Sequence, residues 1–229
     1  LPLVDGAAAP DPDTPLARRL WPRLTAADPV HWPLLDRALV VLADHGMATS
    51  TLAARLAAST RAAPPHVVLA ALGTLAGPLH GGASRAVHRL FERAHRDEPT
   101  RALAQAVRER GRIPGVGHPV HRRRDPRHEL LLTRLREGPP DPDRLATVEA
   151  VVATIEARAD EAPNVDLALG AVTFVAGMDP AAGEVVFALA RIAGWMAHAL
   201  EEYRERPLRF RATGRYVERP LDPAAGVLP

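Results

Sequence analysis

The chain has 229 residues, with 29 basic and 27 acidic side chains and a formal charge of +2. Charged residues make up 24% and hydrophobic residues 47%, which is ordinary for a globular protein. The near balance of charge and the 4% content of aromatic residues argue against a general nucleic-acid binder. With no cysteine, the chain can form neither disulfides nor thiolate metal sites, and it has no thiol nucleophile.

The sequence carries no signal for a membrane or for secretion. No apolar run is long enough to cross a bilayer, and no secretory pattern opens the chain. We therefore expect a cytoplasmic protein with no membrane or nucleic-acid partner. Residues 1–16 (LPLVDGAAAPDPDTPL) are rich in proline and alanine and are predicted to be a flexible linker. Because residue 1 is leucine, we expect a trimmed piece of a longer protein.

The first predicted helices follow in chain order from apolar spacing. A stripe from Leu34 to Leu42 has the helical period and ends at the sequence DHG. A second helix is expected next, with Thr49, Ser50 or Thr51 as its capping residue. A third begins after the proline pair at 64–65 and ends at Gly77-Pro78.

The later predicted helices follow the same rules. Residues Val148 to Ile155 repeat the helical period, and Pro163 closes that segment. The last helix is expected to start at Asp179-Pro180 and to run through AAGEVVFALARIAGWMAHALEEYRER. A short strand is possible only near RYVE, and the arginine-rich tail after Pro207 is either disordered or an arm. The predicted fold class is all-α.

Polar side chains gather where the helices break, and loops on a rigid scaffold often carry function. Each of them also has a structural explanation, as a helix cap, a dipole partner or a hydrogen-bonded loop histidine. The run HRRR is expected to be a solvated face. Arg191 differs, because it lies in the middle of an apolar helix and a buried arginine needs an anion. The residues at the helix breaks are His45, His80, His118 and Asp166.

The chain contains none of the common catalytic motifs. HExxH, GxxxxGK[ST] and GxSxG are absent, and the histidines are too far apart in sequence for a paired helical motif. We expect no metal. A carboxylate with histidines and arginines favours proton abstraction next to a carbonyl group on an anionic substrate.

Five segments resemble, in order and spacing, the successive motifs of the citrate synthase family. The resemblance covers about residues 35–217, and GPLHGG, GxGHxV…DPR and PNVD are together highly specific. The segments are LADHGMATSTLAARLAAST, ALGTLAGPLHGGASRAV, IPGVGHPVHRRRDPRHELL, PNVDLALGAVTFVAGM and FALARIAGWMAHALEEYRERPLRFRATGRYV.

The resemblance implies an all-α homodimer with a large domain and a smaller domain that closes over the site. The N-terminal helices of the large domain are expected to be missing. By position, the linker 1–16 is followed by a first segment of the large domain (17–81), the small domain (82–177) and a C-terminal segment of the large domain with an arm (178–229).

The resemblance also implies catalytic roles. Asp166 matches the base that removes a proton from the methyl group of acetyl-CoA. His80 matches the residue that hydrogen-bonds the thioester oxygen, and His118 the one that polarises and then protonates the oxaloacetate carbonyl. His45 matches a further contact to oxaloacetate.

The remaining matches bind anions. Arg127 and Arg191 match clamps on the oxaloacetate carboxylates, which suit a guanidinium fork. Arg209 matches an arginine donated across the dimer, with Arg211 close enough to compete. Arg122 matches a contact to a coenzyme A phosphate. The resemblance implies a coenzyme A thioester as substrate and free coenzyme A as product, with no permanently bound cofactor. The adenine of coenzyme A would lie against the backbone of Ile113, Pro114, Gly115, Val116 and Gly117.

Two departures mark a divergent member. The family pattern DHE-x-N is replaced by Asp44-His45-Gly46-Met47-Ala48, and Pro119-Val120-His121 stands where Arg-Val-Tyr is more common. The His-Pro pair resembles citryl-CoA lyases.

Four functions are therefore weighed. The first is a citrate synthase that condenses acetyl-CoA with oxaloacetate, as in the tricarboxylic acid cycle. The second is a citryl-CoA lyase or a 2-methylcitrate synthase. The third is a non-catalytic relative that binds coenzyme A or a dicarboxylate, and the last is a nucleic-acid binder using HRRR.

Overall fold

The structure is a computed structural model that describes residues 11, 13–77, 80–118 and 120–215. Within these ranges the chain is helical, with one isolated bridge between Val116 and Pro163 and no sheet, so the all-α prediction is confirmed. The helices are α1 (Leu16–Leu24), the 3₁₀ turn η1 (Pro29–His31), α2 (Trp32–Leu42), α3 (Thr49–Ser59), α4 (Pro64–Leu75), α5 (Ala83–Arg96), α6 (Pro99–Arg110), α7 (Pro126–Glu137), α8 (Pro142–Arg158), α9 (Val165–Val175) and α10 (Ala182–Glu202).

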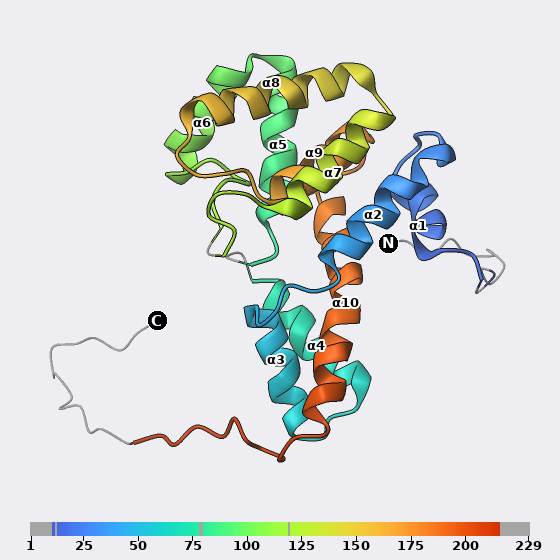
Figure 1. Ribbon diagram of the computed structural model, residues 1–229, viewed down its shortest axis with the longest axis vertical. Helices are drawn as coiled ribbons and strands as arrows, with labels where there is room; N and C mark the ends of the chain where they lie inside the picture. Colours follow the sequence, from blue (N-terminus) through green and yellow to red (C-terminus); the bar gives the residue numbers. More distant parts are fainter. Residues whose placement is uncertain (1–10, 12, 78–79, 119, 216–229) are drawn as a thin grey trace, which may run out of the picture.

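The helices form an upper and a lower group in Figure 1. Helices α5 to α9 pack around a core that includes Phe91, Leu135 and Phe174. Below them α3 and α4 pack against the second half of α10 around Trp195. Helices α1 and α2 lie beside the upper group and bury Trp21 against residues of α7, α9 and α10.

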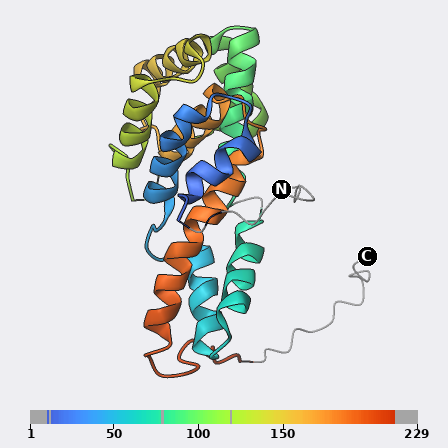
Figure 2. The ribbon, with the colours of Figure 1, turned by 90° about the vertical axis from the view of Figure 1, so that its right-hand side faces the viewer.

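Helix α10 connects the two groups, as Figure 2 shows. Its 21 residues span about 30 Å at the usual helical rise. Gly194 lets α10 touch the backbone that leaves α2, because a Cβ there would lie 2.3 Å from the carbonyl oxygen of Ala43. Its own N–H donates to that oxygen at 3.0 Å. This contact brings the middle of α10 close to the loop that carries His45.

Some helix boundaries differ from those expected from the sequence. The α3 N-cap is Ala48, which has no side-chain cap bond, and Ser50 is fully buried inside the helix. Helix α10 begins at Ala182 rather than at Pro180, and an Asp179 carboxylate oxygen accepts from the N–H of Ala181. The possible strand RYVE lies outside the described residues apart from Arg215.

The shared core of α5 to α9 supports a small domain at residues 82–177, although those borders remain a prediction. The predicted linker lies mostly outside the described residues. The tail does not continue as a helix: Leu208 N–H donates to the Ser59 carbonyl at 3.0 Å, and the chain then leaves the helices as an arm (Figure 1). In the described part of the chain, no helix is long and apolar enough to cross a membrane.

Candidate active site

A pocket of about 380 Å³ is lined by the upper group of helices and its loops, together with His80 from the loop after α4. Three predicted catalytic side chains line it: His80 from the loop after α4, His118 from the loop before α7, and Asp166 from the first turn of α9. The structure thus brings together residues that are far apart in sequence, while their roles remain predictions. The rest of the lining is Gly82, Ala83, Ala86, Arg110, Arg112, Ile113, Pro114, Gly115, Val116, Gly117 and Asn164.

The two motifs GVGH and PNVD are paired by backbone hydrogen bonds. Gly117 N–H donates to the Ala162 carbonyl, and Asn164 N–H donates to the Gly115 carbonyl, both at 2.9 Å. The Asn164 side chain adds a bond from Nδ2 to the Gly117 carbonyl at 2.7 Å, and its Oδ1 accepts from the N–H of Asp166. Asn164 is therefore the cap of α9, which leaves the carboxylate of Asp166 available to the pocket.

Glycine is required at both bends of the GVG segment. Gly115 has φ +75° and Gly117 has φ +81°, a region that side-chain-bearing residues rarely adopt. A Cβ at Gly115 would also lie 2.8 Å from side-chain atoms of Val87 and Leu167. The segment therefore lies directly on α5 and α9, with its backbone facing the pocket.

The ring of His80 is held by Ser50 of α3. Its Nε2 lies 2.9 Å from the Ser50 hydroxyl, which also accepts from the indole N–H of Trp195 at 3.3 Å. Burial, followed by the positive charge of Arg191, lowers the pKa of His80. A neutral imidazole fixed through one nitrogen can donate a hydrogen bond to an oxygen without protonating it.

His45 and His118 form a direct imidazole pair. Their Nε2 atoms lie 3.1 Å apart, and Nδ1 of His118 accepts backbone N–H bonds from Val120 and His121. A neutral His118 must therefore carry its proton on Nε2 and donate it to His45. Burial and the charge of Arg127 lower the pKa of His45 to about 4, and the same causes lower the pKa of His118.

Asp166 is a carboxylate with a raised pKa. Burial raises the pKa of Asp166 to about 6, and the charge of Asp125 acts in the same direction against the opposing charges of Arg127 and Arg191. A carboxylate that holds its proton more tightly is a stronger base once ionised. Such a group suits proton abstraction near neutral pH.

Arg127 is already paired before any ligand binds. Its Nε and Nη2 donate to the two carboxylate oxygens of Asp125 at 2.9 and 2.8 Å. Asp125 is 1% exposed and also accepts the N–H of Val165 at 2.9 Å, which fixes the start of α9. Only the opposite edge of the Arg127 guanidinium remains for a second carboxylate.

Arg191 is buried, as its position in an apolar helix predicts, with 1% of its surface exposed. Its Nε donates to the Leu42 carbonyl at 2.9 Å, and its guanidinium lies 4.5 Å from the ring centroid of Phe187. No carboxylate in the described ranges forms an ion pair with it, although Asp44 and Asp166 act on it electrostatically. A bound anion would complete its surroundings.

Arg122 lies apart from the other predicted coenzyme A residues. It lines a neighbouring hollow of about 570 Å³ together with Arg123 and Arg124. Beside the Ile113–Gly117 backbone the pocket instead contains Arg110 and Arg112, which the sequence analysis did not select.

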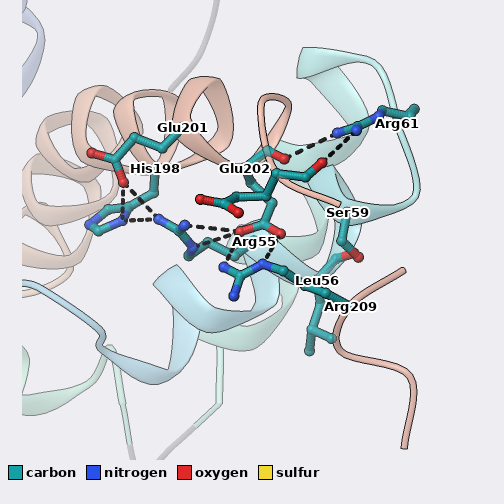
Figure 3. A network of polar contacts seen from close by, with 9 residues as sticks. Arg55, Leu56, Ser59, Arg61, His198, Glu201, Glu202 and Arg209 are labelled. Atoms are coloured by element: carbon teal, nitrogen blue, oxygen red, sulfur yellow. Dashed lines mark hydrogen bonds and ion pairs between the residues drawn. The ribbon is translucent and has the colours of Figure 1, made fainter. Parts of the chain in front are cut away.

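Arg209 lies at the far end of α10, bound to a buried glutamate (Figure 3). Its Nε and Nη2 donate to the Glu202 carboxylate, both at 2.6 Å, and Arg55 binds the same carboxylate from α3 at 2.9 Å. Glu202 is eleven residues beyond Arg191, which corresponds to about 16 Å of helix. Arg209 is therefore not part of its own chain's pocket.

Three residues that contact the predicted site residues were not predicted from the sequence. Asp125 carries a usable signal, because an aspartate before a proline is typical of a helix start. His121 could have been selected for its place in a loop of glycines and histidines. Ser50 carries no such signal, since its contact with His80 exists only in the folded chain.

The arrangement is suited to acid–base chemistry on an anionic substrate, and the comparisons with known proteins specify the family. The family model for "Citrate synthase, C-terminal domain" matches residues 4–220. The citrate synthase of Haloferax volcanii is 34% identical over 82% of this chain and 51% of its own length.

Two solved structures are also similar. The citrate synthase of Thermoplasma acidophilum, in a ternary complex with carboxymethyl coenzyme A and oxaloacetate, is 27% identical, with a TM-score of 0.74 over 96% of this chain and 62% of its own. The citryl-CoA lyase of Hydrogenobacter thermophilus has a TM-score of 0.77 over 91% of this chain and 86% of its own, and at 24% identity it shows a shared fold only.

The chain belongs to the citrate synthase family, as its motifs predicted. It spans about half the length of the curated citrate synthase that it matches.

Proposed function

We propose that the protein condenses acetyl-CoA with oxaloacetate to give citrate and coenzyme A. One observation carries the proposal: His80, His118 and Asp166 line the same pocket. The similar Thermoplasma acidophilum enzyme binds carboxymethyl coenzyme A and oxaloacetate together, which supports a site for both ligands here.

The first step is proton abstraction. The carboxylate of Asp166 takes a proton from the methyl group of acetyl-CoA, and the electron pair moves towards the thioester oxygen. His80 stabilises that oxygen by a hydrogen bond as its charge develops. Because Ser50 holds Nε2, the donor to the thioester would be Nδ1 of His80.

The second step forms the new carbon–carbon bond. The nucleophilic carbon of the enolate attacks the carbonyl carbon of oxaloacetate, and the carbonyl oxygen takes a proton. His118 is the donor, since its backbone contacts place the proton on Nε2, and the proton that Asp166 took from the methyl group restores it by way of solvent. Water then hydrolyses the citryl-CoA thioester to citrate and free coenzyme A.

The anionic groups of the substrates would meet arginines. The open edge of Arg127, the buried Arg191 and the ring of His45 would bind the oxaloacetate carboxylates. Coenzyme A would lie along the Ile113–Gly117 backbone. Its phosphates would be near Arg112, with Arg122 as a contact after closure of the small domain.

The proposed assembly is a homodimer in which each chain lends Arg209 to its partner. Apolar side chains on the outer faces of α3, α4 and α10 support this, since a second copy would cover them. Leu56 is 43% exposed, Leu69 63% and Leu200 57%. We place the protein in the cytoplasm.

Citryl-CoA cleavage is a second candidate that uses the same pocket. It is favoured by the His118-Pro119 pair, which resembles citryl-CoA lyases. In that direction His118 would accept the proton that it donates in condensation. A 2-methylcitrate synthase would require only propionyl-CoA in place of acetyl-CoA, and a non-catalytic relative would bind coenzyme A without turnover.

A thiol-reagent assay distinguishes these functions. The chain has no cysteine, so any thiol signal comes from released coenzyme A. Release from acetyl-CoA that depends on oxaloacetate supports the synthase, and a preference for propionyl-CoA supports the 2-methylcitrate synthase. Cleavage of citryl-CoA to acetyl-CoA and oxaloacetate without thiol release supports the lyase. Binding of coenzyme A without either reaction would contradict the proposal.

A further inference from the structure

Three histidines meet beside the proposed dicarboxylate site. The ring centroid of His121 lies 5.6 Å from that of His45 and 5.0 Å from that of His118. Each residue is half-buried, and one ring nitrogen of each lies within 4.8 Å of those of the other two. His121 has no role in the proposed condensation.

The spacing of the three rings would also fit a metal ion, but the hydrogen bonds argue against one. Nδ1 of His118 accepts two backbone N–H bonds, at 3.1 Å from Val120 and at 3.0 Å from His121. The proton of a neutral His118 is then on Nε2, and neither ring nitrogen has a lone pair left for a metal. The positive charges of Arg127 and Arg191 act on His45 and would also repel a cation.

The charged groups around the three histidines indicate that their ligand is an anion. Asp125 is occupied by Arg127, and Asp44 lies 3.3 Å from Nε2 of His198 on α10. Asp166 on α9 faces the pocket, and the guanidinium of Arg191 approaches from α10. In the part of the chain that the structure describes, none of the three imidazoles forms an ion pair. Three imidazoles without an ion pair, together with the open edge of Arg127 and with Arg191, make a site for a carboxylate ligand.

We propose that His121 is a third imidazole of the dicarboxylate site and donates a hydrogen bond to a carboxylate of bound oxaloacetate, beside His45 and Arg127. This inference rests on the proposed function and deepens it. The hydrogen bond from His121 to the ring of His118 is made by the backbone N–H and not by the side chain. Replacement of the His121 side chain therefore leaves the proton position on His118 unchanged.

The test compares His121→Leu, which has no donor, with His121→Gln, which keeps an N–H donor. His66→Gln, at an exposed histidine on α4, is the matched control. For His121→Leu we expect oxaloacetate to bind about tenfold more weakly by titration calorimetry, with a similar rise in its KM, as for the loss of one charge-assisted hydrogen bond. His121→Gln should fall between this variant and the wild type. The kcat and the KM for acetyl-CoA should stay within about twofold.

Two results would overturn the role of His121 while leaving the proposed function intact. One is oxaloacetate binding by His121→Leu with the wild-type affinity. The other is a micromolar Zn²⁺ site that His121→Gln abolishes without any change in oxaloacetate binding. A wild-type chain that binds neither oxaloacetate nor citrate would instead remove the proposed function as well. As a second measurement, the ring ¹⁵N signals of His121 should shift when oxaloacetate is added, and unchanged signals would contradict the contact.

Discussion

Ser50 and His80 are thirty residues apart in the chain, yet the Ser50 hydroxyl lies 2.9 Å from Nε2 of His80. The same hydroxyl accepts the indole N–H of Trp195, and Ser50 is fully buried. One side chain of α3 thus fixes an imidazole of the pocket and satisfies a buried donor of α10. This contact links the lower group of helices to the site.

Removal of the hydroxyl should affect both activity and stability. In Ser50→Ala the ring of His80 loses its fixed orientation, and we expect kcat to fall about tenfold or more. The buried indole N–H loses its acceptor, so the free energy of unfolding should fall by about 1–3 kcal/mol. Steady-state kinetics and urea denaturation measure the two effects.

Thr51 provides the control for Ser50→Ala. It is also fully buried, but its hydroxyl has no hydrogen-bond partner within the described ranges. Thr51→Val should therefore keep both kcat and the free energy of unfolding close to those of the wild type. Equal losses in the two variants would mean that the hydroxyl of Ser50 has no specific role.

Asp166→Asn tests the proposed base. The amide has nearly the same shape but cannot accept the methyl proton, so kcat should fall by about 10²–10⁴-fold. Oxaloacetate binding should stay within about twofold, because His45, Arg127 and Arg191 are unchanged. Asp160→Asn, at an exposed aspartate of the loop before α9, should behave as the wild type. Full turnover in Asp166→Asn would exclude the carboxylate as the base.

The pH dependence of activity follows from the pKa of about 6 for Asp166. The base works only when ionised, so kcat/KM should fall about tenfold per pH unit below 6. His45, with a pKa of about 4, stays neutral above pH 5 and therefore adds no further change in activity with pH in that range. A pH–rate profile in the direction of coenzyme A release measures this, and a flat profile between pH 5 and 7 would contradict it.

The raised pKa of Asp166 also makes the free energy of unfolding depend on pH. Because the folded chain holds the Asp166 proton more tightly than the unfolded chain, its contribution favours folding at low pH and is lost between pH 3.8 and about 6. The free energy of unfolding of Asp166→Asn should therefore rise by about 1 kcal/mol relative to that of the wild type when the pH is raised from 4.5 to 7. This is less than the full pKa shift would give, because Asp166 remains partly exposed to solvent. Thermal melts at the two pH values give the comparison, and a gain at the lower pH would reverse the sign.

Local features of the sequence predicted several helices, but not the contacts between residues that are distant in the chain. Proline and glycine punctuation with apolar spacing predicted α2, α4 and α8, because these features act over a few residues. The cap expected at Thr49, Ser50 or Thr51 was wrong, since α3 begins after Ala48 and the Ser50 hydroxyl has tertiary partners that local rules do not describe. Likewise, Arg127 could be selected as an anion ligand, but its prior pairing with Asp125 is visible only in the structure. The motifs indicated which side chains carry chemistry, and the fold shows which side chains hold them.

Glu202 and Glu201 offer a final comparison, because both bind Arg55 but only Glu202 is buried. Glu202 also holds Arg209, so Glu202→Gln leaves Arg209 without its carboxylate and takes from Arg55 the buried one of its two, and it should lower the free energy of unfolding by about 2–3 kcal/mol. Glu201 is 65% exposed, and Glu201→Gln should cost less than about 0.5 kcal/mol. Urea denaturation measures both variants, and limited tryptic cleavage after Arg209 should be faster only in Glu202→Gln, where the arm is released. If the two variants lost the same stability, or if the arm were cleaved equally in both, Glu202 would not be the residue that positions Arg209.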